Sequence, residues 1–100
     1  YSTSKAAVHH LTRHLAKRLV GENILVNAIA PGPYPSNMLG SAVAHDYSEI
    51  AASNPRKRVG TPEDIAGLVI FLCSRAGAYT VGETITTDGG LVKTSGHNLG

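Results

Sequence analysis

The fold of this chain is decided by one short apolar run, Ile24-Leu25-Val26-Asn27-Ala28-Ile29-Ala30. The run contains β-branched residues and is nearly continuous in its apolarity, which is typical of a strand covered on both faces in a parallel sheet. The chain continues directly as Pro31-Gly32-Pro33-Tyr34-Pro35. Because prolines and glycines at this density break regular structure, we expect the strand at residues 24–30 to end there.

Residues 1 to about 20, which precede this strand, have the period of an amphipathic helix. At about 100° per residue, one stripe of the helix holds Tyr1, Lys5, Val8, Leu15 and Leu19. The opposite side carries His10, Arg13, His14 and Lys17. We expect the apolar stripe to face the core and the helix to stop at Gly21.

Three more elements are expected after the turn. Residues 39–52 can form a weak helix within a polar stretch. A stronger helix begins with Thr61 as its N-cap and Asp64 three residues later, and it ends near residues 74–77. The β-branched content of residues 83–87 predicts a final strand.

The order of these elements, with helices alternating with strands, predicts an α/β fold with a parallel sheet. Two strands do not make such a sheet stable, because three or more are needed. The chain is therefore interpreted as one half of a domain.

The composition excludes several classes of protein. The 100 residues are 42% hydrophobic and 16% charged, with a net charge of +2. The hydrophobic content is too high for a disordered tail, and the charge is too mild to indicate a nucleic-acid partner. No apolar stretch is long enough to span a membrane. The single cysteine, Cys73, excludes an internal disulfide and fits a reducing compartment, so we expect a cytoplasmic protein.

Lys5 is the unusual residue of the first helix, because it lies on the apolar stripe one turn from Tyr1. A structural interpretation makes it a lysine that extends its ammonium to solvent beside a core tyrosine. A functional interpretation uses the i, i+4 spacing, which brings the two groups together. An ammonium about 4 Å from a phenolate contributes roughly 4 kcal/mol at an effective dielectric near 20, which lowers the pKa of the phenol by up to about three units.

Five motifs, in order and in register, resemble the classical short-chain dehydrogenase/reductase family. They are Tyr1-Ser2-Thr3-Ser4-Lys5-Ala6-Ala7, Val26-Asn27-Ala28-Ile29-Ala30-Pro31-Gly32, Pro55-Arg56-Lys57-Arg58-Val59-Gly60-Thr61-Pro62-Glu63-Asp64-Ile65-Ala66, Phe71-Leu72-Cys73-Ser74, and Gly82 through Asp88-Gly89-Gly90. The resemblance implies that residues 1–91 are the C-terminal catalytic half of a Rossmann-like, doubly wound parallel sheet, and that residues 92–100 are a tail.

The resemblance also implies an activity. Tyr1 matches the family's general acid/base, which donates its proton to a carbonyl oxygen during reduction, and Lys5 matches the residue that lowers its pKa and bonds the nicotinamide ribose. The expected reaction interconverts a ketone or 3-oxoacyl group and a secondary alcohol by hydride transfer with NADP or NAD. The expected partners are a small carbonyl or alcohol substrate and further copies of the chain in a homodimer or homotetramer, with no metal, nucleic acid or membrane.

The turn after the strand carries the other cofactor-binding positions that the resemblance implies. Pro31 and Gly32 match the backbone that approaches the nicotinamide, and Tyr34 matches the position whose backbone contacts the carboxamide. Ser36 stands where the family usually has threonine and keeps the hydroxyl. This loop is similar to a subgroup that includes rhamnolipid-type 3-oxoacyl reductases and fungal relatives. The polar residues 36–56 are expected to form a lid over the cleft.

Some parts of the family pattern are absent. Nothing here matches the glycine-rich phosphate loop, and the family's catalytic serine and asparagine precede the position of Tyr1. We therefore expect the chain to be a fragment that is inactive alone. An alternative is a non-catalytic family member kept as a binding or scaffold protein.

Four further patterns have competing interpretations. Ser2-x-x-Lys5 fits penicillin-recognising serine enzymes, but no Ser-Asp-Asn follows. His10 and His14 have the spacing of metal ligands, but no third ligand is in view. Cys73 is expected to be a small core residue. The basic run at residues 56–58 is either a phosphate contact or, as we expect, a solvated loop face.

Overall fold

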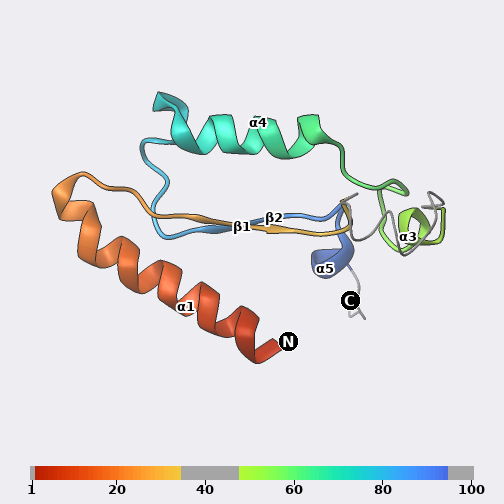
Figure 1. The fold of residues 1–100 in the computed structure, drawn as a ribbon, viewed down its shortest axis with the longest axis horizontal. Coiled ribbons are helices and arrows are strands. Elements are labelled where there is room, and N and C mark those ends of the chain that lie inside the picture. The colour runs from red at the N-terminus through yellow and green to blue at the C-terminus, as the bar shows by residue number, and fades with distance from the viewer. Residues whose placement is uncertain (1, 35–47, 95–100) are drawn as a thin grey trace. The chain divides into compact units, whose positions relative to one another are not determined.

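The computed structural model describes residues 2–34 and 48–94 of the chain (Figure 1). The elements are α1 (Ser2–Leu19), β1 (Ala28–Pro31), α3 (Ser48–Ala52), α4 (Pro62–Cys73), β2 (Thr84–Thr87) and α5 (Leu91–Thr94), with short 3₁₀ turns η1 (Val20–Glu22) and η2 (Arg75–Gly77). The predicted alternation of helices and strands is confirmed. Of the weak helix expected at residues 39–52, residues 48–52 form α3, and residues 39–47 lie outside the described part.

The two strands pair with each other in parallel. The backbone N–H of Ala28 donates to the carbonyl of Glu83 (2.8 Å), and further along the N–H of Gly32 donates to the carbonyl of Thr87 (2.9 Å). Both partners advance in the same chain direction, which is the pattern of a parallel ladder.

The first strand is shorter than the predicted 24–30. Asn27 uses its side chain where a strand would use its backbone: Nδ2 donates to the carbonyl of Thr80 and Oδ1 accepts from the N–H of Glu83, each at 2.9 Å. The side chain thereby fixes the segment before β2 to the segment before β1. Regular pairing starts only at Ala28.

Helix α1 confirms the predicted helix but ends differently. It stops at Leu19 and is followed by η1. The left-handed residue that closes the turn is Asn23 (φ 63°), whose N–H donates to the carbonyl of Val20 (3.0 Å). Gly21 lies inside η1, so the expected stop at Gly21 was wrong. Asparagine is one of the few residues besides glycine that adopts this conformation readily.

The last helix, α5, was not predicted, since residues 92–100 were interpreted as a tail. Asp88 begins it, because its Oδ1 accepts the N–H of Gly90 (2.9 Å) and its Oδ2 accepts the N–H of Val92 (3.0 Å). An aspartate in this position satisfies helix N–H groups that otherwise lack partners.

The chain divides into two units, one formed by Tyr1–Ala30 with Gly67–Ile85 and the other by Pro31–Ala66 with Thr86–Gly100. In the first unit, α1 and the larger part of α4 lie on different sides of the strands (Figure 1). The buried positions of α1 are Thr12 and Ala16, and Ala16 is the only buried hydrophobic residue in the described part of the chain.

The predicted core-facing stripe of α1 was therefore only partly right. Val8 is 52% exposed and Leu15 is 36% exposed, whereas Leu19 is half-buried. Cys73, expected in the core, is exposed at the end of α4. Two strands offer too little surface to cover these helices. None of the helices in residues 2–34 and 48–94 is long and apolar enough to cross a membrane.

Candidate active site

Lys5 lies in the second turn of α1 and is half-buried. It lines a cavity of about 250 Å³ in the first unit. The cavity is formed by Ser4, Lys5, Val8 and His9 of α1, Ala28, Ile29 and Ala30 of β1, and Thr84 of β2. Its surface is mostly apolar, and Lys5 brings an ammonium, a strong hydrogen-bond donor, to its lining. Tyr1 lies outside the described residues.

The turn after β1 belongs to the second unit and brings the backbone close to the end of β2. The N–H of Gly32 donates to the carbonyl of Thr87 (2.9 Å). A Cβ atom on Gly32 would overlap with the Cβ and Cα atoms of Asp88. Glycine is therefore required at position 32 by the close approach of these two segments. Pro31, immediately before it, is exposed.

Tyr34 is held through both its ring and its hydroxyl group. Its hydroxyl forms a hydrogen bond of 2.7 Å with Oγ1 of Thr87. The ring lies directly against Gly60, where a Cβ atom would overlap with ring carbons of Tyr34. The N–H of Gly60 also donates to the carbonyl of Pro33 (2.9 Å). Ser36 lies outside the described residues, as does most of the predicted lid.

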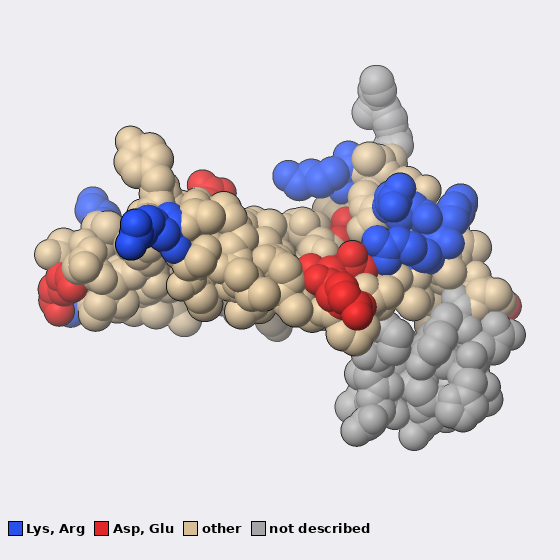
Figure 2. Space-filling view, turned by 90° about the horizontal axis from the view of Figure 1, so that it is seen from above, with Lys and Arg blue, Asp and Glu red and all other residues tan. Residues whose placement is uncertain are grey.

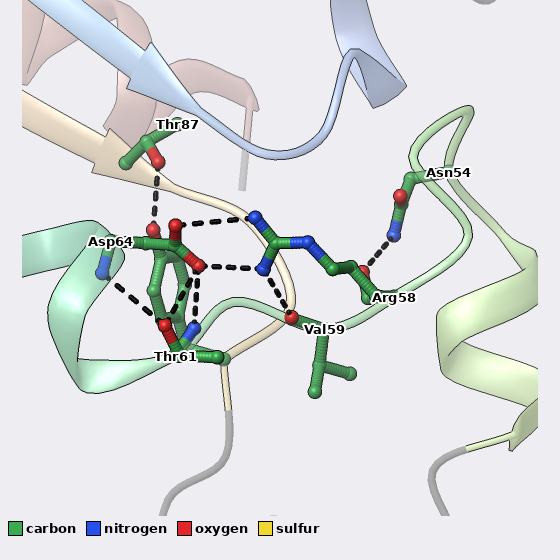
Figure 3. Close-up of polar contacts among 7 residues, drawn as sticks. Asn54, Arg58, Val59, Thr61, Asp64 and Thr87 are labelled. Carbon is green, nitrogen blue, oxygen red and sulfur yellow. Dashed lines mark hydrogen bonds and ion pairs between the residues drawn. The ribbon is translucent and has the colours of Figure 1, made fainter.

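The segment that leads into α4 is ordered by a cluster of polar contacts around Asp64 (Figure 3). Oδ2 of Asp64 accepts hydrogen bonds from Nη1 of Arg58 (2.7 Å), the N–H of Thr61 (2.8 Å) and the hydroxyl of Thr61 (3.0 Å). Nη2 of Arg58 donates to Oδ1 (3.2 Å), and the Thr61 hydroxyl accepts the N–H of Asp64 (3.3 Å). This is a reciprocal cap, and it confirms the predicted start of the helix.

The charges in this cluster reinforce each other. The hydrogen bonds from Arg58 and then from Thr61 hold the pKa of the Asp64 carboxyl well below its usual range. The hydrogen bond between Arg58 and Asp64 and the negative charge of Asp64 raise the pKa of Arg58. Because Asp64 stays ionised and fully bonded, it is suited to a structural role and not to proton transfer.

Asn54 is the most deeply buried side chain among the described residues of the second unit, at 2% exposure. Its Nδ2 donates to the carbonyl of Arg58 (2.9 Å), while its Oδ1 has no hydrogen-bond partner among the described residues. Gly89 approaches it so closely that a Cβ atom at position 89 would lie 2.5 Å from Oδ1. The loop before α4 is thereby fixed against the loop after β2.

The basic run at residues 56–58 is exposed, as expected for a loop face. Figure 2 shows basic side chains gathered near acidic ones on the visible face. Within the run, Arg58 pairs with Asp64, and Nζ of Lys57 donates to the carbonyl of Ala52 (3.1 Å). Arg56 lines a polar cavity of about 70 Å³ in the second unit, together with Tyr34, Asp64 and neighbouring residues.

The candidate metal ligands on α1 are not part of a metal site among the described residues. His10 and His14 are exposed on α1. No group of three or more His, Cys, Asp or Glu side chains in residues 2–34 and 48–94 is placed to hold a metal ion. Sequence reasoning missed the contact between Tyr34 and Thr87, which are 53 residues apart and share no local pattern. The Arg58–Asp64 pair was also missed, although the spacing of Thr61 and Asp64 indicated the cap.

Comparison with known proteins gives the family. A family model described as enoyl-(acyl carrier protein) reductase matches residues 1–92. The rhamnolipids biosynthesis 3-oxoacyl-(acyl-carrier-protein) reductase of Pseudomonas aeruginosa is 50% identical over 93 residues, which cover 90% of this chain and 36% of that protein. The 3-oxoacyl-(acyl-carrier-protein) reductase FabG of Aquifex aeolicus is 42% identical over 94 residues, which cover 91% of this chain and 37% of that protein.

A solved structure supports the same family. The RhlG/NADP active-site complex of Pseudomonas aeruginosa matches with a TM-score of 0.83 and 50% identity, covering 91% of this chain and 38% of that one. The chain thus spans a little over a third of the length of these relatives, and its helices and strands are part of a Rossmann fold. The chain belongs to the short-chain dehydrogenase/reductase family of oxidoreductases.

Proposed function

We propose that these residues form the catalytic half of an NAD(P)(H)-dependent oxidoreductase that interconverts a ketone or 3-oxoacyl group and a secondary alcohol. The observation that carries the proposal is the position of Lys5, half-buried on α1 and lining a mostly apolar cavity beside β1. Since the chain spans little more than a third of its relatives, the activity is assigned to a protein of the relatives' length that contains these residues.

In this proposal Tyr1 transfers the proton and Lys5 adjusts its pKa. A tyrosine with a pKa of about 10 is a poor proton-transfer group near neutrality. Lys5 follows Tyr1 by four residues on the same helix, so its ammonium stabilises the phenolate and lowers the pKa of the phenol. During reduction the Tyr1 hydroxyl gives its proton to the carbonyl oxygen, and during oxidation the phenolate takes the proton from the alcohol.

The residues fit a nicotinamide dinucleotide, NADP or NAD. The ammonium of Lys5 offers hydrogen-bond donors to ribose hydroxyls, and the aliphatic walls beside it, such as Val8 and Ile29, suit a flat ring. We assign the backbone of Pro31, Gly32 and Tyr34 and the hydroxyl of Ser36 to the nicotinamide side. When bound, the cofactor supplies or accepts the hydride. The NADP bound in the RhlG complex supports the phosphorylated form.

A 3-oxoacyl compound is the proposed substrate. Two relatives, at 50% and 42% identity, are named 3-oxoacyl-(acyl-carrier-protein) reductases. We also propose that the whole protein is a cytoplasmic homodimer or homotetramer. The exposure of Leu11 (53%) on α1, outside the Lys5 cavity, supports an assembly that covers this helix.

The test is Tyr1→Phe in the whole protein, with NADPH and a 3-oxoacyl thioester as substrates. Removal of the phenol hydroxyl removes the general acid, which contributes about 10² to 10⁴ in rate, so kcat should fall by at least a hundredfold while NADPH still binds. Tyr79→Phe is the matched control, because Tyr79 is fully exposed.

A Tyr1→Phe protein that keeps wild-type turnover would refute the assignment of Tyr1. A wild-type protein that neither binds NADPH nor reduces any 3-oxoacyl or simple ketone substrate would favour the non-catalytic binding or scaffold protein instead.

A further inference from the structure

The side chain of Tyr34 makes contacts that its proposed backbone role does not require. Its hydroxyl bonds to Oγ1 of Thr87 at 2.7 Å, and the ring is half-buried. Tyr79, by contrast, is fully exposed. A tyrosine hydroxyl that is partly removed from water needs a partner, and here the partner is the last residue of β2.

Gly60 provides the second contact. No side chain fits at position 60, because the ring of Tyr34 occupies the space where a Cβ atom would stand. The N–H of Gly60 donates to the carbonyl of Pro33, one residue before Tyr34. Gly60 itself follows Arg58 and precedes Thr61, both of which are bonded to Asp64. The loop that contacts Tyr34 is therefore ordered by its own cluster.

The segment 32–34 is thus fixed at three points. The N–H of Gly32 is bonded to the carbonyl of Thr87, the carbonyl of Pro33 is bonded to Gly60, and the phenol of Tyr34 is bonded to the side chain of Thr87. Of these three, only the phenol contact depends on side chains, so it is the contact that sequence can alter without touching the backbone.

We propose that the phenol of Tyr34 is a positioning residue for the cofactor: its hydrogen bond to Thr87, with the ring against Gly60, holds the backbone of residues 32–34 in the geometry that receives the nicotinamide. This rests on the proposed function. A loop that is ordered before binding loses less conformational entropy when the cofactor binds, so the contact strengthens NADPH binding. The phenol does not take part in proton transfer, so its expected effect is on cofactor binding.

The experiment measures the Kd for NADPH and the steady-state kinetics of the whole protein carrying Tyr34→Phe, Thr87→Val or both. Tyr79→Phe is the matched control for loss of a phenol hydroxyl, and Thr87→Ser tests rescue because it keeps the hydroxyl. Thermal unfolding of each variant reports whether the fold itself is affected.

Loss of one such hydrogen bond should raise the Kd for NADPH about three- to tenfold in Tyr34→Phe and in Thr87→Val. The double variant should be no worse than either single one, since both remove the same contact. In Thr87→Val the KM for the carbonyl substrate and kcat at saturating NADPH should stay within about twofold of wild type, and Thr87→Ser and Tyr79→Phe should bind NADPH normally.

Wild-type NADPH affinity in both single variants would overturn the proposal, even if their unfolding temperatures fell, because the contact would then be structural only. Additive losses in the double variant would also overturn it. A wild-type protein that does not bind NADPH would instead overturn the proposed function, and this inference with it.

Discussion

In the unit that carries α1, Lys5 reaches its place through its register on a helix, whereas in the other unit Tyr34 is placed by contacts with residues far along the chain. The cavity beside Lys5 is mostly apolar, and several apolar side chains of α1 are exposed. The surroundings of Tyr34 are polar and closely packed, with glycines at positions where no side chain fits. The proposed catalytic lysine is placed by its spacing on a helix, while the proposed cofactor-binding turn has its backbone fixed from several directions.

Placement by distant contacts, as at Tyr34, is tested most strongly at Gly60, where we expect the largest loss of stability. Gly60→Ala places a methyl group in the space that the ring of Tyr34 occupies, so the loop or the ring must move. Overpacking of this kind lowers the unfolding free energy by about 1 to 3 kcal/mol. Chemical denaturation of the whole protein measures this loss.

The matched control is Gly67→Ala, because a Cβ atom at that position in α4 meets nothing within 4 Å. Alanine is the better helix former, so this variant should gain up to about 1 kcal/mol. Equal effects of the two substitutions would show that Gly60 is not chosen for its contact with Tyr34.

We expect a smaller loss of stability from Asp64→Asn, and this loss depends on pH. The pKa of its carboxyl is lower in the folded protein than in the unfolded chain, because Arg58 and Thr61 donate to the charged form. The stability that this provides is fully present above the ordinary carboxyl pKa of about 4 and is lost as the pH falls below it. Asp64→Asn should flatten the acid side of the stability curve.

The effect of Asp64→Asn should shrink at high salt, since the Arg58–Asp64 pair is partly exposed. The measurement is the unfolding midpoint between pH 3 and 7 in low and high salt. The acid sensitivity of the wild type should exceed that of Asp64→Asn, and identical curves would remove the role assigned to the carboxylate.

The same comparison explains what the sequence predicted. The start of α4 was predicted correctly because Thr61 and Asp64 are three residues apart and cap each other locally. The pairing of Tyr34 with Thr87 could not be predicted, because it depends on β1 and β2 being neighbours. The burial of Cys73 was predicted wrongly, because helical periodicity identifies a face but not the surface that covers it.

The central claim, that Lys5 lowers the pKa of Tyr1, is tested most directly by the pH dependence of kcat/KM for alcohol oxidation. The whole protein is compared with its Lys5→Met variant, which keeps the aliphatic length of the side chain and removes the charge. The acid limb of the profile reports the group that must lose its proton before it can act as a base. We expect this limb to move upward by as much as about three units in Lys5→Met, toward the pKa of a free tyrosine. A limb that stays at its wild-type position would contradict the claim.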